Sequence, residues 1–234
     1  GRMRSYRLSR DTGGYRKNPG RQAESLRRCR WFSRGYYLDF GDLNIPVLFI
    51  VVTGTANGTN FTDGLDGLAG SVTVIVAVFY SVVAIGLESG IEPITCAVAG
   101  ALLGFLLFNV HPASVFMGDT GSLTIGGLIG IMAILLHKEI LLVLLCGVFV
   151  AENLSVIAQV AYFKKGKRRG VKQRLFRRAP LHHHYNMEEE KLDPECTYLF
   201  KGPQRPLHEA KITVRFWIVT IVMAAITLMT LKIR

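Results

Sequence analysis

The stretch GLAGSVTVIVAVFYSVVAIGL occupies residues 67–87 and contains 21 residues without a charged side chain. An α-helix rises about 1.5 Å per residue, so about 20 residues are needed to cross a hydrocarbon core of about 30 Å. A buried helix of a large water-soluble protein is the alternative, but such a protein needs far more polar surface than this composition supplies. The stretch therefore predicts a transmembrane helix.

Further segments on both sides of this stretch have the same uncharged character. Residues 43–62 and 93–118 contain 20 and 26 residues without a charge. Three later segments are shorter or carry one acid: 120–136 has 17 residues, 140–163 has 24 and includes Glu152, and 216–231 has 16. The expected fold class is therefore all-α, a polytopic integral membrane bundle of about six transmembrane helices.

The overall composition agrees with a membrane protein. Half of the 234 residues are hydrophobic, only 19% are charged and the mean hydropathy is +0.30, which disfavours a water-soluble domain. The four cysteines lie far apart and form no CxxC pair, so we expect them to be reduced and structural.

The formal net charge of +11 comes mainly from residues 1–36, which contain ten Arg and one Lys against two acids. Residues 1–35 are expected to be a separate basic segment, either a disordered tail or a stretch that is not native coding sequence. A nucleic-acid partner is not expected, because no adjoining fold or interleaved aromatic pattern accompanies the arginines. Residues 36–234 are expected to form the membrane domain.

Loop charge predicts the orientation of the bundle. Residues 164–178 contain nine Lys or Arg and no acid, which favours the cytoplasmic side. By alternation, the segments around 63–66 and 111–119 also face the cytoplasm, while 88–92 and 137–139 lie on the opposite side. All the polar clusters are therefore expected at one face of the membrane.

The first of these clusters follows the predicted helix 43–62. Asn60, Asp63 and Asp66 are three positions apart, so they are neighbours on one face if the helix continues. Carboxylates at the edge of the hydrocarbon are costly and usually serve a site, although acids that simply face water at a helix end are the alternative. Gly64 allows close approach of another backbone or a ligand.

The second cluster runs from Asn109 to Ser122 and contains Asp119 directly before the next predicted helix. Mg²⁺ keeps several waters and is typically held by one or two carboxylates together with substrate phosphates. Asp119 is therefore a candidate Mg²⁺ ligand, and a helix cap without a metal is the alternative.

The third cluster is APLHHHY, residues 179–185. Three consecutive side chains cannot all face one metal on a regular helix, so His182, His183 and His184 are not expected to form a zinc site. Contacts with diphosphate or sugar oxygens fit them better. Glu152 and Gln159 lie inside a predicted span and are expected to line the same site.

Four stretches together resemble one family: TDGLDGLAG at 62–70, NVHPASVFMGDTGSLTIGG at 109–127, PLHHHY at 180–185 and VRFWIVTIVMAAITLMTLKIR at 214–234. They are similar to the bacterial phospho-N-acetylmuramoyl-pentapeptide transferases, members of the polyprenyl-phosphate N-acetylhexosamine-1-phosphate transferase superfamily. The resemblance extends over residues 36–234.

The resemblance implies an enzyme of about ten transmembrane helices in the bacterial inner membrane, with its active site facing the cytoplasm. It implies Mg²⁺-dependent transfer of phospho-N-acetylmuramoyl-pentapeptide from UDP to undecaprenyl phosphate, which gives lipid I and UMP in peptidoglycan synthesis. Matching positions imply catalytic roles for Asp63, Asp66, Asp119, His182, His183 and His184, with Asp119 as the Mg²⁺ ligand. They imply substrate-binding roles for Asn60, Gly64, Leu65, Asn109, Phe116 and Gln159.

The chain departs from the family pattern in two ways. It has no spanning segment before residue 43 and no adjacent Asp-Asp pair, so we expect an N-terminally truncated form without activity of its own. The loop 186–211 is longer than expected. A catalytically inactive membrane fragment, a transferase of N-acetylglucosamine 1-phosphate and a transporter are the alternatives, the last disfavoured because no internal repeat is present. A homodimer is one assembly that the sequence leaves open.

Overall fold

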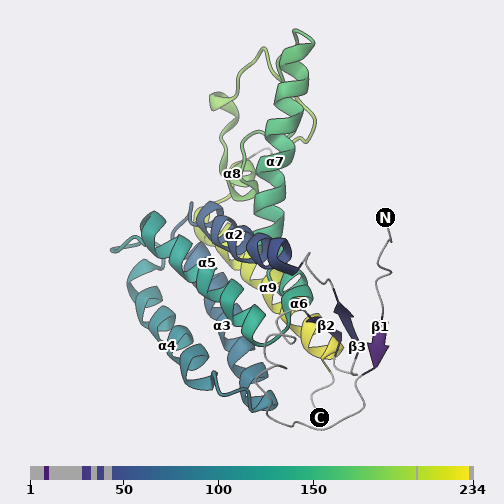
Figure 1. Ribbon diagram of the computed structural model, residues 1–234. Helices are drawn as coiled ribbons and strands as arrows, with labels where there is room; N and C mark the ends of the chain where they lie inside the picture. Colours follow the sequence, from purple (N-terminus) through teal and green to yellow (C-terminus); the bar gives the residue numbers. More distant parts are fainter. Residues whose placement is uncertain (1–7, 11–27, 33–35, 40–43, 204, 232–234) are drawn as a thin grey trace, which may run out of the picture.

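The computed structural model describes residues 8–10, 28–32, 36–39, 44–203 and 205–231, and most of them are helical (Figure 1). The helices are α2 (Asn44–Thr62), α3 (Leu68–Leu87), α4 (Glu92–Asn109), α5 (Gly118–Leu135), α6 (Glu139–Leu145), α7 (Gly147–Arg168), α8 (Leu181–Asn186), the 3-10 helix η2 (Glu189–Lys191) and α9 (Glu209–Thr230). The prediction of an all-α polytopic membrane bundle is confirmed.

The strands are short and lie outside the bundle of long helices. β1 (Leu8–Arg10), β3 (Tyr36–Asp39) and β2 (Arg28–Phe32) form an antiparallel sheet in that order. β4 (Gln173–Arg174) and β5 (Thr197–Tyr198) pair in parallel within the loops around α8. The predicted basic segment 1–35 falls mostly outside the described residues, so its nature stays a prediction.

The prediction of about six spans is too high for the described residues. Four helices, α3, α4, α5 and α9, are long and apolar enough to cross a membrane. α6 and α7 add a fifth span only if they count as one, because they are bent by 79° at the break between them. α2 does not reach the same hydropathy, since Asn57, Thr59 and Asn60 make its second half polar.

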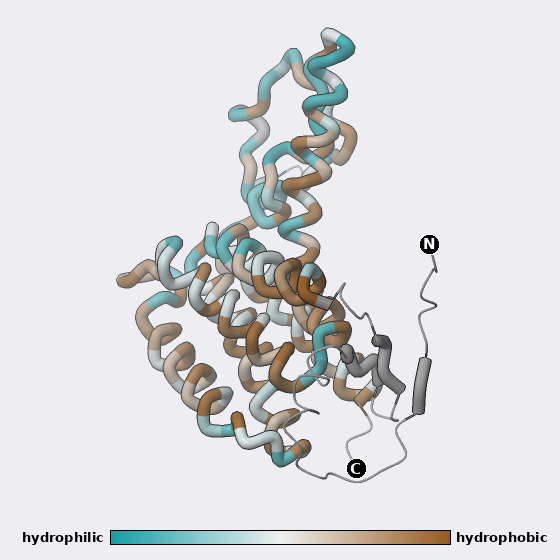
Figure 2. Tube along the Cα trace, in the orientation of Figure 1, coloured by the Kyte–Doolittle hydropathy of each residue, from teal (hydrophilic) through white to brown (hydrophobic). Residues whose placement is uncertain are grey.

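α3 is the central helix of the bundle, and most of its side chains are buried. It packs between α4 and α9, and its Leu68, Val72 and Val76 are completely buried in the main core. The indole Nε1 of Trp217 in α9 donates a hydrogen bond to the hydroxyl of Ser71 in α3. The most apolar candidate span is therefore also the most buried one. Hydrophobic residues also occur along the outer helices (Figure 2), and many of their side chains, such as Leu107 of α4 and Ile131 of α5, are exposed.

Two glycines bring α2 and α5 into close contact. A Cβ atom at Gly126 would lie 2.6 Å from the carbonyl oxygen of Thr55, and one at Gly130 would lie 2.7 Å from the Thr55 hydroxyl. Glycines four residues apart form the small surface through which membrane helices approach each other. This contact sets the position of the polar ends of both helices.

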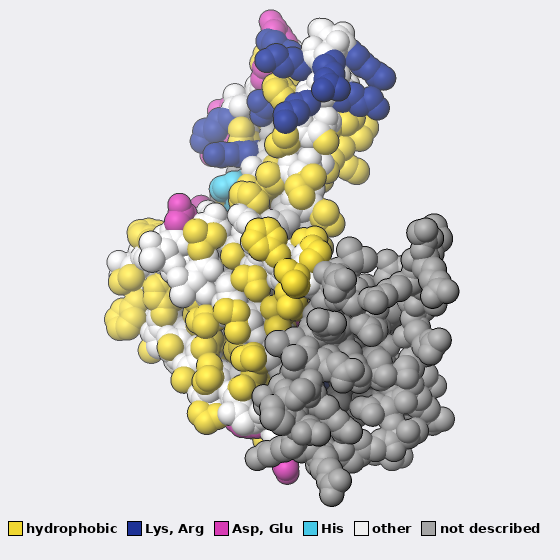
Figure 3. All heavy atoms as spheres, viewed as in Figure 1, with side chains coloured by type: hydrophobic (Ala, Val, Ile, Leu, Met, Phe, Trp, Pro, Cys, Tyr) yellow, Lys and Arg dark blue, Asp and Glu magenta, His cyan; other side chains and the backbone are white. Residues whose placement is uncertain are grey.

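α7 extends away from the bundle together with α8 and the loops that follow it (Figure 1). Lys and Arg side chains gather at the far end of this extension (Figure 3). The predicted basic segment 164–178 therefore includes the last turn of a helix as well as a loop.

Candidate active site

The first two polar clusters meet at the polar ends of α2 and α5. The Asn60 amide Nδ2 donates to Asp119 Oδ1 at 2.9 Å and to the Ser122 hydroxyl at 3.0 Å. Asn60 is on the last turn of α2, while Asp119 and Ser122 are on the first turn of α5. Asp119 is exposed, so its carboxylate is accessible to a ligand.

Asp63 follows α2 in the turn that leads to α3 and lies near Asp119. Burial raises the pKa of the Asp63 carboxyl to about 6, and the negative charge of Asp119 contributes to the rise. Two neighbouring carboxylates are a favourable surrounding for a cation, because a cation offsets the repulsion between their negative charges. The oxygen-rich set of Asp63, Asp119 and Ser122 fits the ligand preference of Mg²⁺.

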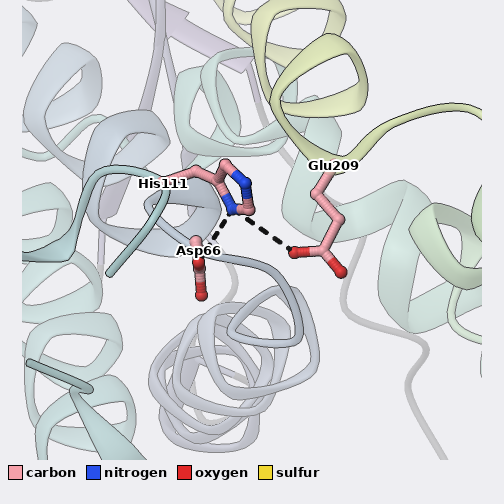
Figure 4. A group of neighbouring side chains, drawn as sticks. All are labelled: Asp66, His111 and Glu209. Atoms are coloured by element: carbon pink, nitrogen blue, oxygen red, sulfur yellow. Dashed lines mark hydrogen bonds and ion pairs between the residues drawn. The ribbon is translucent and has the colours of Figure 1, made fainter. Parts of the chain in front are cut away.

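A second acidic group lies beside the first and is shown in Figure 4. The ring Nδ1 of His111 lies 3.0 Å from Asp66 Oδ2 and 3.9 Å from Glu209 Oε2. One ligand atom from each of the three residues lies within 4.8 Å of the others, so this group could also hold a metal ion. It does not include Asp119, the residue that the sequence analysis selects as the metal ligand.

Asp66 also fixes the backbone around it. Its Oδ2 accepts a hydrogen bond from the Ala113 backbone N–H at 3.1 Å, and its carbonyl oxygen accepts one from the Thr213 hydroxyl at 3.4 Å. Asp66 therefore connects the α2–α3 turn, the α4–α5 turn and the start of α9.

The three histidines of α8 have different surroundings. His182 is completely buried against Glu152 of α7. His184 is buried too, and its Nδ1 accepts a hydrogen bond from the Arg177 backbone N–H at 3.1 Å. The ring of His183 is only partly buried, and among the described residues no hydrogen bond of its ring is found.

The electrostatic surroundings keep His183 neutral. Burial lowers the pKa of His183 to about 4, and electrostatic interactions with the neighbouring His182 ring and the Arg178 guanidinium lower it further. Burial and the charge of Arg177 also lower the pKa of His184. A neutral imidazole has one donor and one acceptor nitrogen, so His183 can bind hydroxyl or phosphate oxygens without adding a charge.

The Gln159 side chain forms its hydrogen bonds with the backbone of the basic loop that follows α7. Its Oε1 accepts hydrogen bonds from the backbone N–H groups of Leu175 at 3.1 Å and Phe176 at 2.9 Å. Its Nε2 donates to the Phe176 carbonyl at 3.2 Å. The predicted substrate-binding role of Gln159 therefore stays a prediction, and the described contacts give it a supporting role for the loop.

The remaining predicted residues are spread around the same turns. Asn109 is buried and donates from Nδ2 to the Val115 carbonyl at 2.8 Å, which supports the α4–α5 turn. Phe116 projects from this turn with 74% of its surface exposed, which leaves its ring available for stacking. Leu65 is buried in the main core and anchors the turn that carries Asp63, Gly64 and Asp66.

Glu209, His111 and Ser122 belong to this region but are not among the site residues predicted from the sequence. Glu209 precedes the segment VRFW by a few positions, but one acid in the first turn of a helix is usually explained by the helix dipole. Ser122 lies within the quoted stretch 109–127, where its spacing of three from Asp119 places both on one face.

Comparisons with known proteins agree with the family that the sequence motifs resemble. Residues 28–137 match the family described as glycosyl transferase family 4. The chain is 51% identical over 206 residues to a phospho-N-acetylmuramoyl-pentapeptide-transferase of Phocaeicola vulgatus, a match that covers 81% of this chain and 49% of the relative. The enzyme of the same name from Bacteroides thetaiotaomicron is 50% identical over 208 residues, with 82% and 49% covered. That of Flavobacterium psychrophilum is 41% identical over 226 residues, with 87% and 50% covered.

The match to glycosyl transferase family 4 over residues 28–137 and the helices long and apolar enough to cross a membrane indicate the same class of membrane protein. Within this class, the chain belongs to the family of phospho-N-acetylmuramoyl-pentapeptide transferases and matches their C-terminal part. The chain spans about half the length of the curated relatives it matches.

Proposed function

We propose that the chain carries the active site that transfers phospho-N-acetylmuramoyl-pentapeptide from UDP to undecaprenyl phosphate, with release of UMP and formation of lipid I. The single observation that supports this most is the contact between Asn60 and Asp119 beside Asp63. It joins two motifs of the family into one oxygen-rich site at the polar end of the bundle. We place this end at the cytoplasmic face of the inner membrane, since the basic segment 164–178 favours that side.

Each residue of the proposed site would have a distinct role in transfer. Asp119, with Asp63 and Ser122 beside it, would hold Mg²⁺, which when bound neutralises negative charge on the phosphates. Asn60 keeps the Asp119 carboxylate in place through its amide. His183 would bind diphosphate or sugar oxygens with its neutral ring, and exposed Phe116 would stack on the uracil.

The lipid acceptor explains why the site lies at the membrane surface. A polyprenyl phosphate has its phosphate at the membrane surface, and the donor approaches from the aqueous side. Both substrates are anionic, so transfer requires positive charge near them. The nine Lys and Arg of residues 164–178 supply a positive field at this end of the molecule (Figure 3).

Release of UMP tests the proposal. Because the chain covers about half of its relatives, the assay uses a chimera in which residues 36–234 replace the matching part of the Phocaeicola vulgatus enzyme. With undecaprenyl phosphate as acceptor, we expect turnover of UDP-N-acetylmuramoyl-pentapeptide and none of UDP-N-acetylglucosamine. Turnover of UDP-N-acetylglucosamine alone would support the other branch of the superfamily, and no turnover beside an active parent enzyme would support an inactive fragment.

A further inference from the structure

A buried polar pair connects α7 to the turn that carries the aspartates. Glu152 of α7 and His182 of α8 are both completely buried, and Glu152 Oε1 lies 3.2 Å from His182 Nδ1. The same carboxylate accepts hydrogen bonds from the backbone N–H of Leu181 at 2.6 Å and of His182 at 3.2 Å. A carboxylate this deep in an apolar helix is costly unless such partners satisfy it.

The number of donors fixes the tautomer of His182. The two oxygens of Glu152 face two backbone N–H groups and one ring nitrogen, and an ionised carboxylate can only accept hydrogen bonds. The Nδ1 atom of His182 must therefore carry the proton. In the neutral ring the other nitrogen, Nε2, then has a free lone pair and no hydrogen.

The surroundings of Nε2 require this tautomer. Nε2 is buried, and it has no hydrogen-bond partner among the described residues. It points at Gly64, where an added Cβ atom would lie only 2.3 Å from Nε2 and 3.0 Å from Cε1. A hydrogen on Nε2 would be buried without an acceptor among the described residues, so the packing of the ring on the Gly64 backbone favours an unprotonated Nε2.

We propose that Glu152 and His182 are a positioning pair: Glu152 holds His182 as the Nδ1–H tautomer, and the ring docks the turn of residues 63–66 onto α8. His182 then acts through Gly64 on the neighbouring Asp63 and Asp66, and it does not contact the substrates. This differs from the direct catalytic role that the family resemblance implies for His182. The effect on transfer rests on the proposed function, whereas the tautomer and the docking do not.

The tautomer is measured on the 234-residue chain in detergent micelles by ¹⁵N NMR of the histidine rings, with His182→Gln used to assign the signal. We expect the shifts of a ring that is protonated on Nδ1 and unprotonated on Nε2. A ring protonated on Nε2, or on both nitrogens, would overturn the proposal without any measurement of activity.

The consequence for transfer is measured in the chimera. Glu152→Gln replaces one acceptor oxygen with an NH₂ group that must face a buried N–H, so it changes the tautomer or releases α8. Gly64→Ala leaves Glu152 intact but pushes the ring away from the turn. We expect each to lower kcat about a hundredfold, the loss typical of a ~1 Å displacement, with KM for the nucleotide donor changed less than about threefold.

The matched control is Ser155→Ala, because within the described part of the chain the Ser155 hydroxyl donates only to the Glu152 carbonyl, at 2.7 Å within α7. It should keep kcat within about twofold. If Glu152→Gln does not fold, the kcat of Gly64→Ala and the NMR shifts of His182 still test the positioning role. Near-normal kcat in Gly64→Ala would overturn the docking role. An inactive unsubstituted chimera would contradict the proposed function alone, since the NMR result would stand.

Discussion

The Asn60 amide donates to the Asp119 carboxylate at 2.9 Å, although 59 positions separate the two residues in the sequence. This contact exists because α2 and α5 pack closely through Gly126 and Gly130, which leave no room for a side chain between the helices. Packing within the bundle and the arrangement of the polar site are therefore coupled.

Gly126→Ala tests this coupling. The added Cβ atom would lie 2.6 Å from the backbone oxygen of Thr55, which cannot move without moving α2. We expect a loss of about 1–3 kcal/mol in the free energy of unfolding, as is typical of overpacking. Thermal unfolding in detergent measures it.

Gly127→Ala is the control, because nothing lies within 4 Å of a Cβ atom at Gly127. It should be neutral or stabilise the helix by up to about 1 kcal/mol. Equal unfolding temperatures for both variants would show that the close contact of α2 and α5 does not limit stability.

Asp63→Asn should stabilise the metal-free protein near pH 7.5. The folded-state pKa of about 6 lies above the ordinary value of 3.8, so the folded protein binds this proton more tightly than the unfolded chain does. Protonation of Asp63 therefore stabilises the folded protein at low pH, and this stabilisation is lost as the pH rises through about 6. Because Asp63 is only about half buried, solvent screening reduces the gain from the substitution to about 1 kcal/mol.

The check is the unfolding temperature of Asp63→Asn and the unsubstituted chain at pH 7.5 and pH 4.5. The difference should be clearly smaller at pH 4.5, which lies between the folded pKa of about 6 and the ordinary value of 3.8, and added Mg²⁺ should reduce it at pH 7.5. A difference that is the same at both pH values would rule out the raised pKa as its cause.

Asp66→Ala should loosen the α4–α5 turn. The substitution removes the acceptor for the exposed His111 ring and for the partly buried Ala113 backbone N–H. We expect a loss of about 1–3 kcal/mol and faster proteolysis within the turn. Glu195→Ala is the control, since its ion pair with Lys172 is exposed and such pairs contribute at most about 1 kcal/mol.

Cysteine labelling tests the orientation of the bundle. In a variant without the native cysteines, Lys167→Cys and Ser114→Cys should react with a membrane-impermeant reagent only from the cytoplasmic side. Ser89→Cys, in the α3–α4 connection, should react only from the opposite side. Labelling of Lys167→Cys and Ser89→Cys from the same side would contradict the proposed topology.

Much of the fold follows from the sequence because lipid requires long uncharged helices. α3, α4, α5 and α9 coincide with predicted spans for this reason. The bend of 79° between α6 and α7 could not be predicted, since a count of residues between charges measures hydropathy and not direction. The absence of charges predicts a span over residues 43–62, but the amide and hydroxyl groups of α2 lower its hydropathy.

The site was predicted in its composition but not in its connections. The motifs identify Asp63, Asp66, Asp119 and the histidines as polar groups at one end of the bundle, and the structure brings these segments together. The partner of each side chain depends on tertiary packing. For this reason the sequence does not predict the contact between Glu209 and His111 or the pairing of Glu152 with His182.

The transfer rate of the chimera with Asp119→Asn tests the central claim most directly. Asparagine keeps the size of the side chain and its ability to accept a hydrogen bond, but it lacks the charge that a Mg²⁺ site needs. The measurement is formation of lipid I from radiolabelled UDP-N-acetylmuramoyl-pentapeptide and undecaprenyl phosphate at saturating Mg²⁺. We predict Mg²⁺-dependent synthesis by the unsubstituted chimera and a loss of at least about a hundredfold in Asp119→Asn, with the unfolding temperature unchanged. Turnover of Asp119→Asn close to that of the unsubstituted chimera would contradict the assignment of this site.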